Sequence, residues 1–210
     1  AGLIEKRVSL PVVLENDGKC AALAELWLGS LKGVDSGMVL TLGTGIGGGI
    51  VAHGKLLRGR NFAAGELSNF PTTIKPVQDP IMAWAQVNGT RGLTGAYAQR
   101  KGLEPKEVNG KRFFEAYHAN DEDAIASLSE FASNFANAIY AIQTVLDNER
   151  VAIGGGISAQ EALINAFNEK LSLLFSNLHP MSPIKQPEVV RCTFGNDSNL
   201  IGALYHYLYE

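Results

Sequence analysis

The chain has 210 residues, of which 46% are hydrophobic and 19% are charged, and its formal net charge is −3. This composition is typical of a globular protein with a full core, and the small negative charge argues against nucleic acid or an anionic membrane as the main partner. No apolar run reaches membrane-spanning length, and Cys20 and Cys192 form neither a disulfide framework nor a zinc pattern. We therefore expect a cytoplasmic protein with reduced cysteines.

Hydrophobic periodicity predicts alternating strands and helices along the first part of the chain. A short apolar strand at 11–15 comes before a helix that starts at residue 17. Three more strands are expected at 38–42, 49–52 and 55–57. Because short turns join these three strands, we expect them to pair as antiparallel neighbours.

From residue 61 to residue 118 the pattern is weaker, prolines mark a loop, and short helices are expected at 81–85, 93–100 and 110–117. A long helix is predicted over 121–147, because acidic residues at its start suit the positive end of a helix dipole and its apolar residues share one face. That face consists of Leu128, Phe131, Phe135, Ile139, Ile142 and Val145.

In the last part of the chain, predicted strands and helices alternate again. A strand at 150–153 is followed by a segment, Ser158 to Glu161, that has the form of a capping box and predicts a helix to residue 175. A strand at 188–194 and a closing helix at 199–209 complete the pattern.

The most informative segment is 42–49, in which five of the eight residues are glycine. Glycine lets the backbone approach a ligand closely, and successive free amides form a concavity for anions. Gly43, Gly45 and Gly48 match the spacing G-x-G-x-x-G, but a strand follows where a dinucleotide fingerprint requires a helix. We interpret the segment as a glycine-rich hairpin that holds phosphates with its amides and Thr44. A tight hairpin that binds nothing is the alternative.

A second glycine run, Gly154-Gly155-Gly156, joins the strand at 150–153 to the next helix. Ligands of α/β sheets bind at the carboxyl ends of strands, which is where this run lies. Taken alone, the run is equally compatible with a strand-to-helix turn that has no ligand. Two such runs in one α/β chain favour binding of nucleotide phosphates.

Seven segments resemble, in the same order, the ROK family of sugar kinases and sugar-responsive repressors. They are residues 14–17, 21–25, 42–49, 54–59, 63–67, 152–158 and 195–203. The resemblance implies an actin-like ATPase fold related to ribonuclease H, an α/β architecture with a mixed sheet flanked by helices. It also implies a division into 1–28, a remnant of the small lobe and hinge; 29–195, the large lobe; and 196–210, a helix that returns to the small lobe.

The Asp-x-Gly-Gly-Thr phosphate loop, with which family members begin, does not occur in this sequence. We therefore expect the chain to be the carboxyl-terminal two-thirds of such a protein and a poor catalyst in isolation. The family also implies a homodimer formed through helices of the large lobe.

Asp17 is the residue we assign to catalysis. Sugar phosphorylation needs a carboxylate that orients the attacking hydroxyl and accepts its proton, and the family places this base at the Asp of a Glu-Asn-Asp segment, which matches Asp17. Asn16 would bind sugar hydroxyls. Both residues also suit a helix N-cap, which is the structural alternative.

Glu66 matches the Gly-Glu motif that contacts the sugar in the family, and a solvated surface Glu is the alternative. Asn69, which we also assign to the sugar site, occupies the position of a zinc-binding His in other members. The residues 88–95 lack the cysteines of those members, so we expect no structural zinc. This altered loop leaves room for β-glucosides, amino sugars or another hexose derivative.

We therefore predict an ATP-dependent kinase of a hexose or hexose derivative. ATP and Mg²⁺ would bind between the lobes, with phosphates and adenosine near Gly43, Thr44, Gly45 and Gly154 to Gly156. The Mg²⁺ ion would be held mainly by ATP and water. The alternative is a non-catalytic, sugar-sensing domain of a ROK transcriptional regulator. A purely structural oligomerisation domain is a third interpretation.

Overall fold

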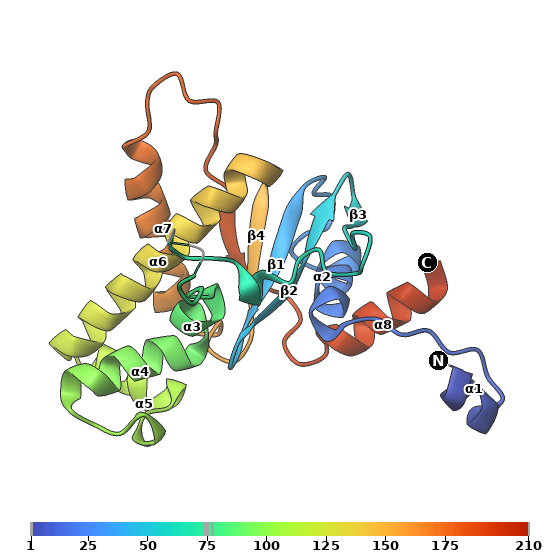
Figure 1. Cartoon of the computed structure of the whole chain (residues 1–210), viewed down its shortest axis with the longest axis horizontal. Helices are drawn as coiled ribbons and strands as arrows, with labels where there is room; N and C mark the ends of the chain where they lie inside the picture. The colour runs from blue at the N-terminus through green and yellow to red at the C-terminus, as the bar shows by residue number, and fades with distance from the viewer. Residues whose placement is uncertain (1, 74–75, 77, 210) are drawn as a thin grey trace.

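The computed structural model describes residues 2–73, 76 and 78–209, and a five-stranded mixed sheet lies at its centre (Figure 1). The strand order is β3-β2-β1-β4-β5. The three strands β1 (Gly37–Leu42), β2 (Ile46–Ala52) and β3 (Lys55–Leu56) pair antiparallel, as the sequence predicts. The other two, β4 (Arg150–Gly154) and β5 (Glu188–Arg191), extend the sheet in parallel with β1.

Helices cover both faces of the sheet (Figure 1). One face is covered by α2 (Asp17–Leu28), and α8 (Ser198–Tyr209) packs on α2. The other face is covered by a group of helices and 3₁₀ turns that includes the long helix. These are η1 (Leu67–Asn69), α3 (Trp84–Asn88), α4 (Thr90–Lys101), η2 (Pro105–Glu107), α5 (Gly110–His118), α6 (Glu122–Leu146) and α7 (Glu161–Ser176). The mixed sheet flanked by helices is the predicted fold class.

The alternation of side chains along β1 separates the core into two clusters. Met38 and Leu40 join the cluster built with α3 to α7, where the rings of Phe135 and Phe167 stack with centroids 3.7 Å apart. Val39, the residue between them, joins the cluster built with α2. Each face of the sheet therefore holds its own helical layer.

The long helix α6 forms where the sequence predicts it, and Asp121 caps it. The Asp121 carboxylate accepts hydrogen bonds from the backbone of Asp123 at 3.0 Å and of Ala124 at 3.1 Å. Five of the six residues in the predicted apolar stripe are buried, but Val145 is 79% exposed, so its assignment to the core is wrong. In the last turn of α6 it is Leu146, four residues after Ile142, that packs against the core, and Val145 lies on the outward side of the helix.

Three local predictions are also wrong. Residues 11–15, all of them described, form no strand, because no neighbouring strand offers hydrogen bonds there. A short helix, α1 (Gly2–Val8), was not predicted and has no buried residue. Ser158 does not cap α7: its hydroxyl donates to the carbonyl of Gly155 at 2.8 Å, within the turn after β4, and the helix begins at Glu161.

The contact between α2 and α8 depends on Gly202. A Cβ atom at this position would overlap the carbonyl oxygen of Cys20. The opposite face of α8 leaves Leu200 74%, Leu204 49% and Leu208 52% exposed. Within the described part of the chain, no helix combines the length and the apolar character that crossing a membrane requires.

Candidate functional site

The first turn of α2 presents Asn16 and Asp17 at the carboxyl end of β1. Asn16 is the N-cap, and its Oδ1 accepts from the backbone N–H of Lys19 at 3.1 Å. Asp17 is the first helical residue, and its Oδ1 accepts from the N–H of Gly18 at 2.8 Å. The capping role therefore belongs to Asn16, and the exposed Asp17 carboxylate lies at the positive end of the helix dipole.

A cavity of about 340 Å³, here called the hairpin cavity, lies against this turn. It is bordered by polar side chains from α2, β1 and the segment around η1, and by glycines of both predicted loops. Its lining is Asn16, Asp17, Thr41, Gly43, Gly45, Ile46, Gly47, Gly48, Glu66, Ser68 and Gly155. Hydroxyl, amide and carboxylate groups around a space of this size suit a polyhydroxylated small molecule.

A second cavity of about 400 Å³, here called the α8 cavity, lies at the amino-terminal end of α8. It is lined by Asp17, Gly18, Thr41, Gly155, Gly156, Gly195, Asn196, Ser198 and Asn199. The two cavities share Asp17, Thr41 and Gly155. Asp17 is thus placed at the junction, where a group on one side could react with a group on the other.

A third cavity of about 660 Å³, here called the helical cavity, lies between α4, α5 and the turn after β4. It shares Gly43 with the hairpin cavity and Gly156 with the α8 cavity. Apolar side chains of Val108, Phe114 and Ile157 border it together with several polar ones. The three cavities therefore adjoin one another across both glycine runs.

The first glycine run divides into two parts. Gly43 and Thr44 are exposed, and a Cβ atom at Gly43 would meet nothing within 4 Å. Gly48 and Gly49 are buried inside β2, where a Cβ atom at Gly49 would lie 2.7 Å from the Cβ of Ala22 on α2. The later glycines therefore let α2 approach the sheet. Gly43 instead leaves open space beside its Cα, while its N–H donates to the carbonyl of Gly45 at 3.0 Å.

The second glycine run has one residue with a positive φ. Gly155 has φ +92°, and a Cβ atom there would overlap the carbonyl oxygen of Leu42. Gly156 is exposed and open. Gly154 is instead buried as the last residue of β4, paired with Thr41, and it borders none of the three cavities.

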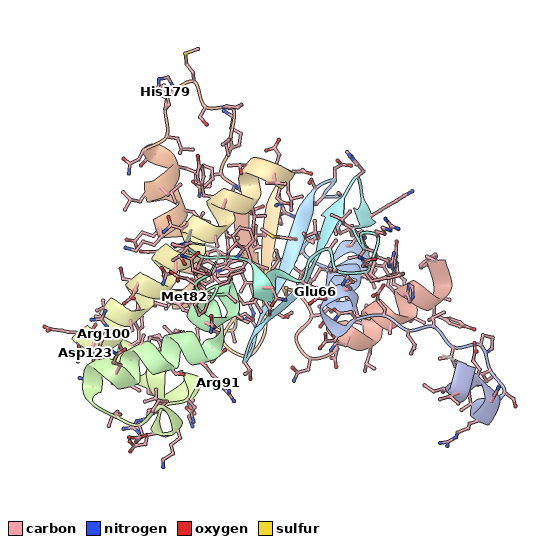
Figure 2. The ribbon with its side chains drawn as sticks, viewed as in Figure 1. Glu66, Met82, Arg91, Arg100, Asp123 and His179 are labelled. Atoms are coloured by element: carbon pink, nitrogen blue, oxygen red, sulfur yellow. The ribbon has the colours of Figure 1, made fainter. Side chains whose placement is uncertain are left out.

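Glu66 borders the hairpin cavity together with Asp17, and Figure 2 shows it beside α2 near the centre of the molecule. Its side chain is 47% exposed, and its Oε1 lies 3.4 Å from Nζ of Lys19. Asn69, at the end of η1, is exposed and is absent from the lining of this cavity. The structure thus brings together Asn16, Asp17 and Glu66, and it leaves Asn69 outside that group.

Three residues of this site were not singled out from the sequence. Thr41 borders two of the cavities, and its place next to the glycine hairpin at the end of a strand was an available signal. Ser68 donates its hydroxyl to the carbonyl of Ile46 at 2.6 Å and so fixes η1 against β2. Lys19 is 1% exposed, and no pattern in the sequence distinguishes it from a surface lysine.

No group of three or more His, Cys, Asp or Glu side chains that could hold a metal ion lies among residues 2–73, 76 and 78–209. Cys20 follows Asp17 by one helical turn. Burial, and after it the charges of Glu15 and Asp17, raise the pKa of the Cys20 thiol, which therefore stays protonated at neutral pH. The polar chemistry of the site is that of carboxylates, hydroxyls, amides and backbone N–H groups.

Comparison with known proteins gives consistent matches. A model described as the ROK family matches residues 1–209. A β-glucoside kinase of Listeria innocua is 32% identical over 211 residues, which cover 99% of this chain and 68% of the relative.

Two solved structures match along nearly the whole chain. A ROK family protein of Streptococcus pneumoniae in complex with sucrose has a TM-score of 0.86 at 25% identity, with 98% of this chain and 69% of that chain covered. A ROK family glucokinase of Streptomyces griseus, in complex with glucose and AMPPNP, has a TM-score of 0.82 at 27% identity, with 95% and 69% covered. The actin-like ATPase fold predicted from the sequence is confirmed.

Proposed function

The chain belongs to the ROK family, and from this premise we propose that it carries the sugar site and the transfer carboxylate of an ATP-dependent kinase of a hexose or hexose derivative. The observation that supports this most is the position of Asp17, which borders both the hairpin cavity and the α8 cavity. Phosphoryl transfer needs a carboxylate beside the acceptor hydroxyl, with that hydroxyl directed at the γ-phosphorus, and a residue that borders both cavities can meet this requirement.

The sugar binds in the hairpin cavity. Asn16 and Glu66 hydrogen-bond its hydroxyls, and Asn69, which does not border this cavity, has no part in the proposed site. Asp17 orients the reacting hydroxyl and accepts its proton while the hydroxyl oxygen bonds to the γ-phosphorus of ATP. The bond from that phosphorus to the bridging oxygen breaks at the same time, and ADP leaves with the electron pair.

ATP binds along the other two cavities. The backbone near Thr44, Gly45, Gly155 and Gly156 faces its phosphates. Gly43, whose own N–H donates to the carbonyl of Gly45 at 3.0 Å, contributes open space, as does Gly156, because nothing lies where a Cβ atom would stand. The adenosine occupies the helical cavity, against its apolar residues. Gly154 acts through packing at the end of β4. A Mg²⁺ ion bound to the ATP phosphates neutralises their charge, with water as its main further ligand.

We propose a glucose derivative with a substituent on the anomeric oxygen as the substrate, with amino sugars as the second class. The identity of 32% to a β-glucoside kinase supports this order. The altered segment 88–95 does not, because it forms the end of α3 and the start of α4 and borders the helical cavity instead of the hairpin cavity. We also propose a cytoplasmic location and a homodimer. The proposed division of the chain is 1–28, 29–195 and 196–210. The sugar-sensing alternative predicts binding of sugar without turnover.

The test is ATP-dependent phosphorylation of glucose, methyl β-D-glucoside, cellobiose and N-acetylglucosamine by the intact protein. Asp17→Asn should lower kcat by about 10²- to 10⁴-fold, the range of a lost general base. Asp147→Asn is the matched control, because Asp147 ends α6 in a left-handed conformation, φ 48°, that asparagine adopts readily. Equal turnover by wild type and Asp17→Asn would remove Asp17 from its role.

A further inference from the structure

Lys19 has an environment that a lysine side chain rarely occupies. Its side chain is 1% exposed, although it lies in the first turn of α2, two residues after Asp17. Transfer of an ammonium group out of water is unfavourable unless the charge is paired and hydrogen-bonded. The partners of Nζ therefore indicate what this lysine does.

Both partners of Nζ lie on the connection between β3 and η1. Nζ donates a hydrogen bond to the carbonyl oxygen of Phe62 at 2.8 Å and lies 3.4 Å from Oε1 of Glu66. The same ammonium group thus joins the first turn of α2 to the segment that carries Glu66. Asp17 and Glu66 both border the hairpin cavity, so this contact ties together the two segments that carry them.

We propose that Lys19 is a positioning residue that orients and electrostatically supports the Glu66 carboxylate for binding of sugar hydroxyls. This inference rests on the proposed function. The contact uses Oε1, so the second oxygen of the carboxylate, Oε2, is left for a ligand hydroxyl. Because Glu66 is 47% exposed, its own packing does not restrict its rotamer, and the buried ammonium supplies that restriction.

A second ion pair between the same two segments supports this arrangement. Nε of Arg58 lies 2.8 Å from Oε2 of Glu15, whose side chain is 7% exposed, and Oε1 of Glu15 accepts from the N–H of Asn16 at 2.8 Å. Residues 15–19 and residues 58–66 are therefore joined on both sides of Asp17. Loss of the Lys19 ammonium leaves the ion pair between Arg58 and Glu15 in place, so the effect of this change on the site should be confined to Glu66.

The test is a double-mutant cycle on sugar affinity, measured by calorimetry with the sugar that the wild type phosphorylates best. Lys19→Met should weaken binding about tenfold, and raise KM more than it lowers kcat, because Glu66 loses its orientation and its charge partner. In the background of Glu66→Gln the same change should weaken binding less than about twofold, since there is no carboxylate left to position.

Two further variants make the result unambiguous. Lys101→Met is the matched control: it removes the 2.8 Å ion pair between Lys101, at the end of α4, and Asp121, the N-cap of α6, and it should leave sugar affinity unchanged. Lys19→Gln retains a donor for the Phe62 carbonyl without the charge, and it replaces Lys19→Met if that variant does not fold. An equal loss in both backgrounds, or no loss in either, would overturn this inference. Absence of sugar binding by the wild type would overturn the proposed function as well.

Discussion

The two glycine runs of this protein look alike in sequence but differ in what their glycines do. In the first, Gly48 and Gly49 lie inside β2 and make room for the neighbouring strand and for α2. In the second, Gly155 and Gly156 form an exposed turn beyond the end of β4. The number of glycines in a run therefore overestimates how many of its residues can contact a ligand, because some of them are needed for close packing.

The largest effect is expected at Gly48. A Cβ atom there would overlap the carbonyl oxygen of Val39 on β1, and the residue has φ +154°. Gly48→Ala should therefore lower the free energy of unfolding by about 3 kcal/mol, as overpacking of a buried site does. Urea denaturation measures this change, and a loss below about 0.5 kcal/mol, the level of a neutral surface substitution, would refute the packing role of the first run.

An intermediate effect is expected at Gly155. Its φ of +92° is unfavourable for a residue with a Cβ atom, which would in addition overlap the carbonyl oxygen of Leu42. Gly155→Ala should lower the free energy of unfolding by about 2 kcal/mol. It should also weaken AMPPNP binding in calorimetry, because the turn borders both small cavities. Loss of stability with unchanged affinity would show that the second run is structural only.

The smallest effect on stability is expected at Gly43. Because a Cβ atom there meets nothing within 4 Å, Gly43→Ala should change the free energy of unfolding by less than about 0.5 kcal/mol. The methyl group would lie where the phosphates are proposed to bind, so AMPPNP affinity should fall about tenfold. Gly95→Ala, on the open face of α4, is the control, and it should leave that affinity unchanged. Unchanged affinity in both variants would remove Gly43 from the nucleotide site.

Much of the fold follows from pattern alone. The apolar residues at 49–52 predict a strand after the first glycine run, and this correctly replaced a dinucleotide loop with an antiparallel hairpin, although β2 begins earlier, at Ile46. Val145 fits the helical period and is nevertheless exposed, because the apolar face continues from Ile142 to Leu146, and the three- and four-residue spacings cannot be distinguished from the pattern alone. Ser158 matches a capping box, but α7 begins at Glu161 with Gln160 as its N-cap, so Ser158 lies within the preceding turn, where its hydroxyl donates to the carbonyl of Gly155. The exact start of a helix is decided only by the folded backbone.

The site was predictable to a lesser degree. Asn16, Asp17 and Glu66 belong to motifs with a family precedent, and the structure brings them to one cavity. Lys19 has no such motif, and its burial results from a contact with residues more than forty positions away, Phe62 and Glu66. Contacts of that kind depend on how α2 docks on the sheet, which the sequence of α2 does not specify.

The central claim is that the Asp17 carboxylate contacts the sugar hydroxyl that attacks the phosphate to be transferred. A crystal structure of the intact protein with methyl β-D-glucoside and AMPPNP tests it directly. The account predicts a sugar in the hairpin cavity with one hydroxyl within about 3.2 Å of an Asp17 carboxylate oxygen and directed at the γ-phosphate. A sugar bound elsewhere, or an Asp17 carboxylate more than about 5 Å from every sugar hydroxyl, would contradict it.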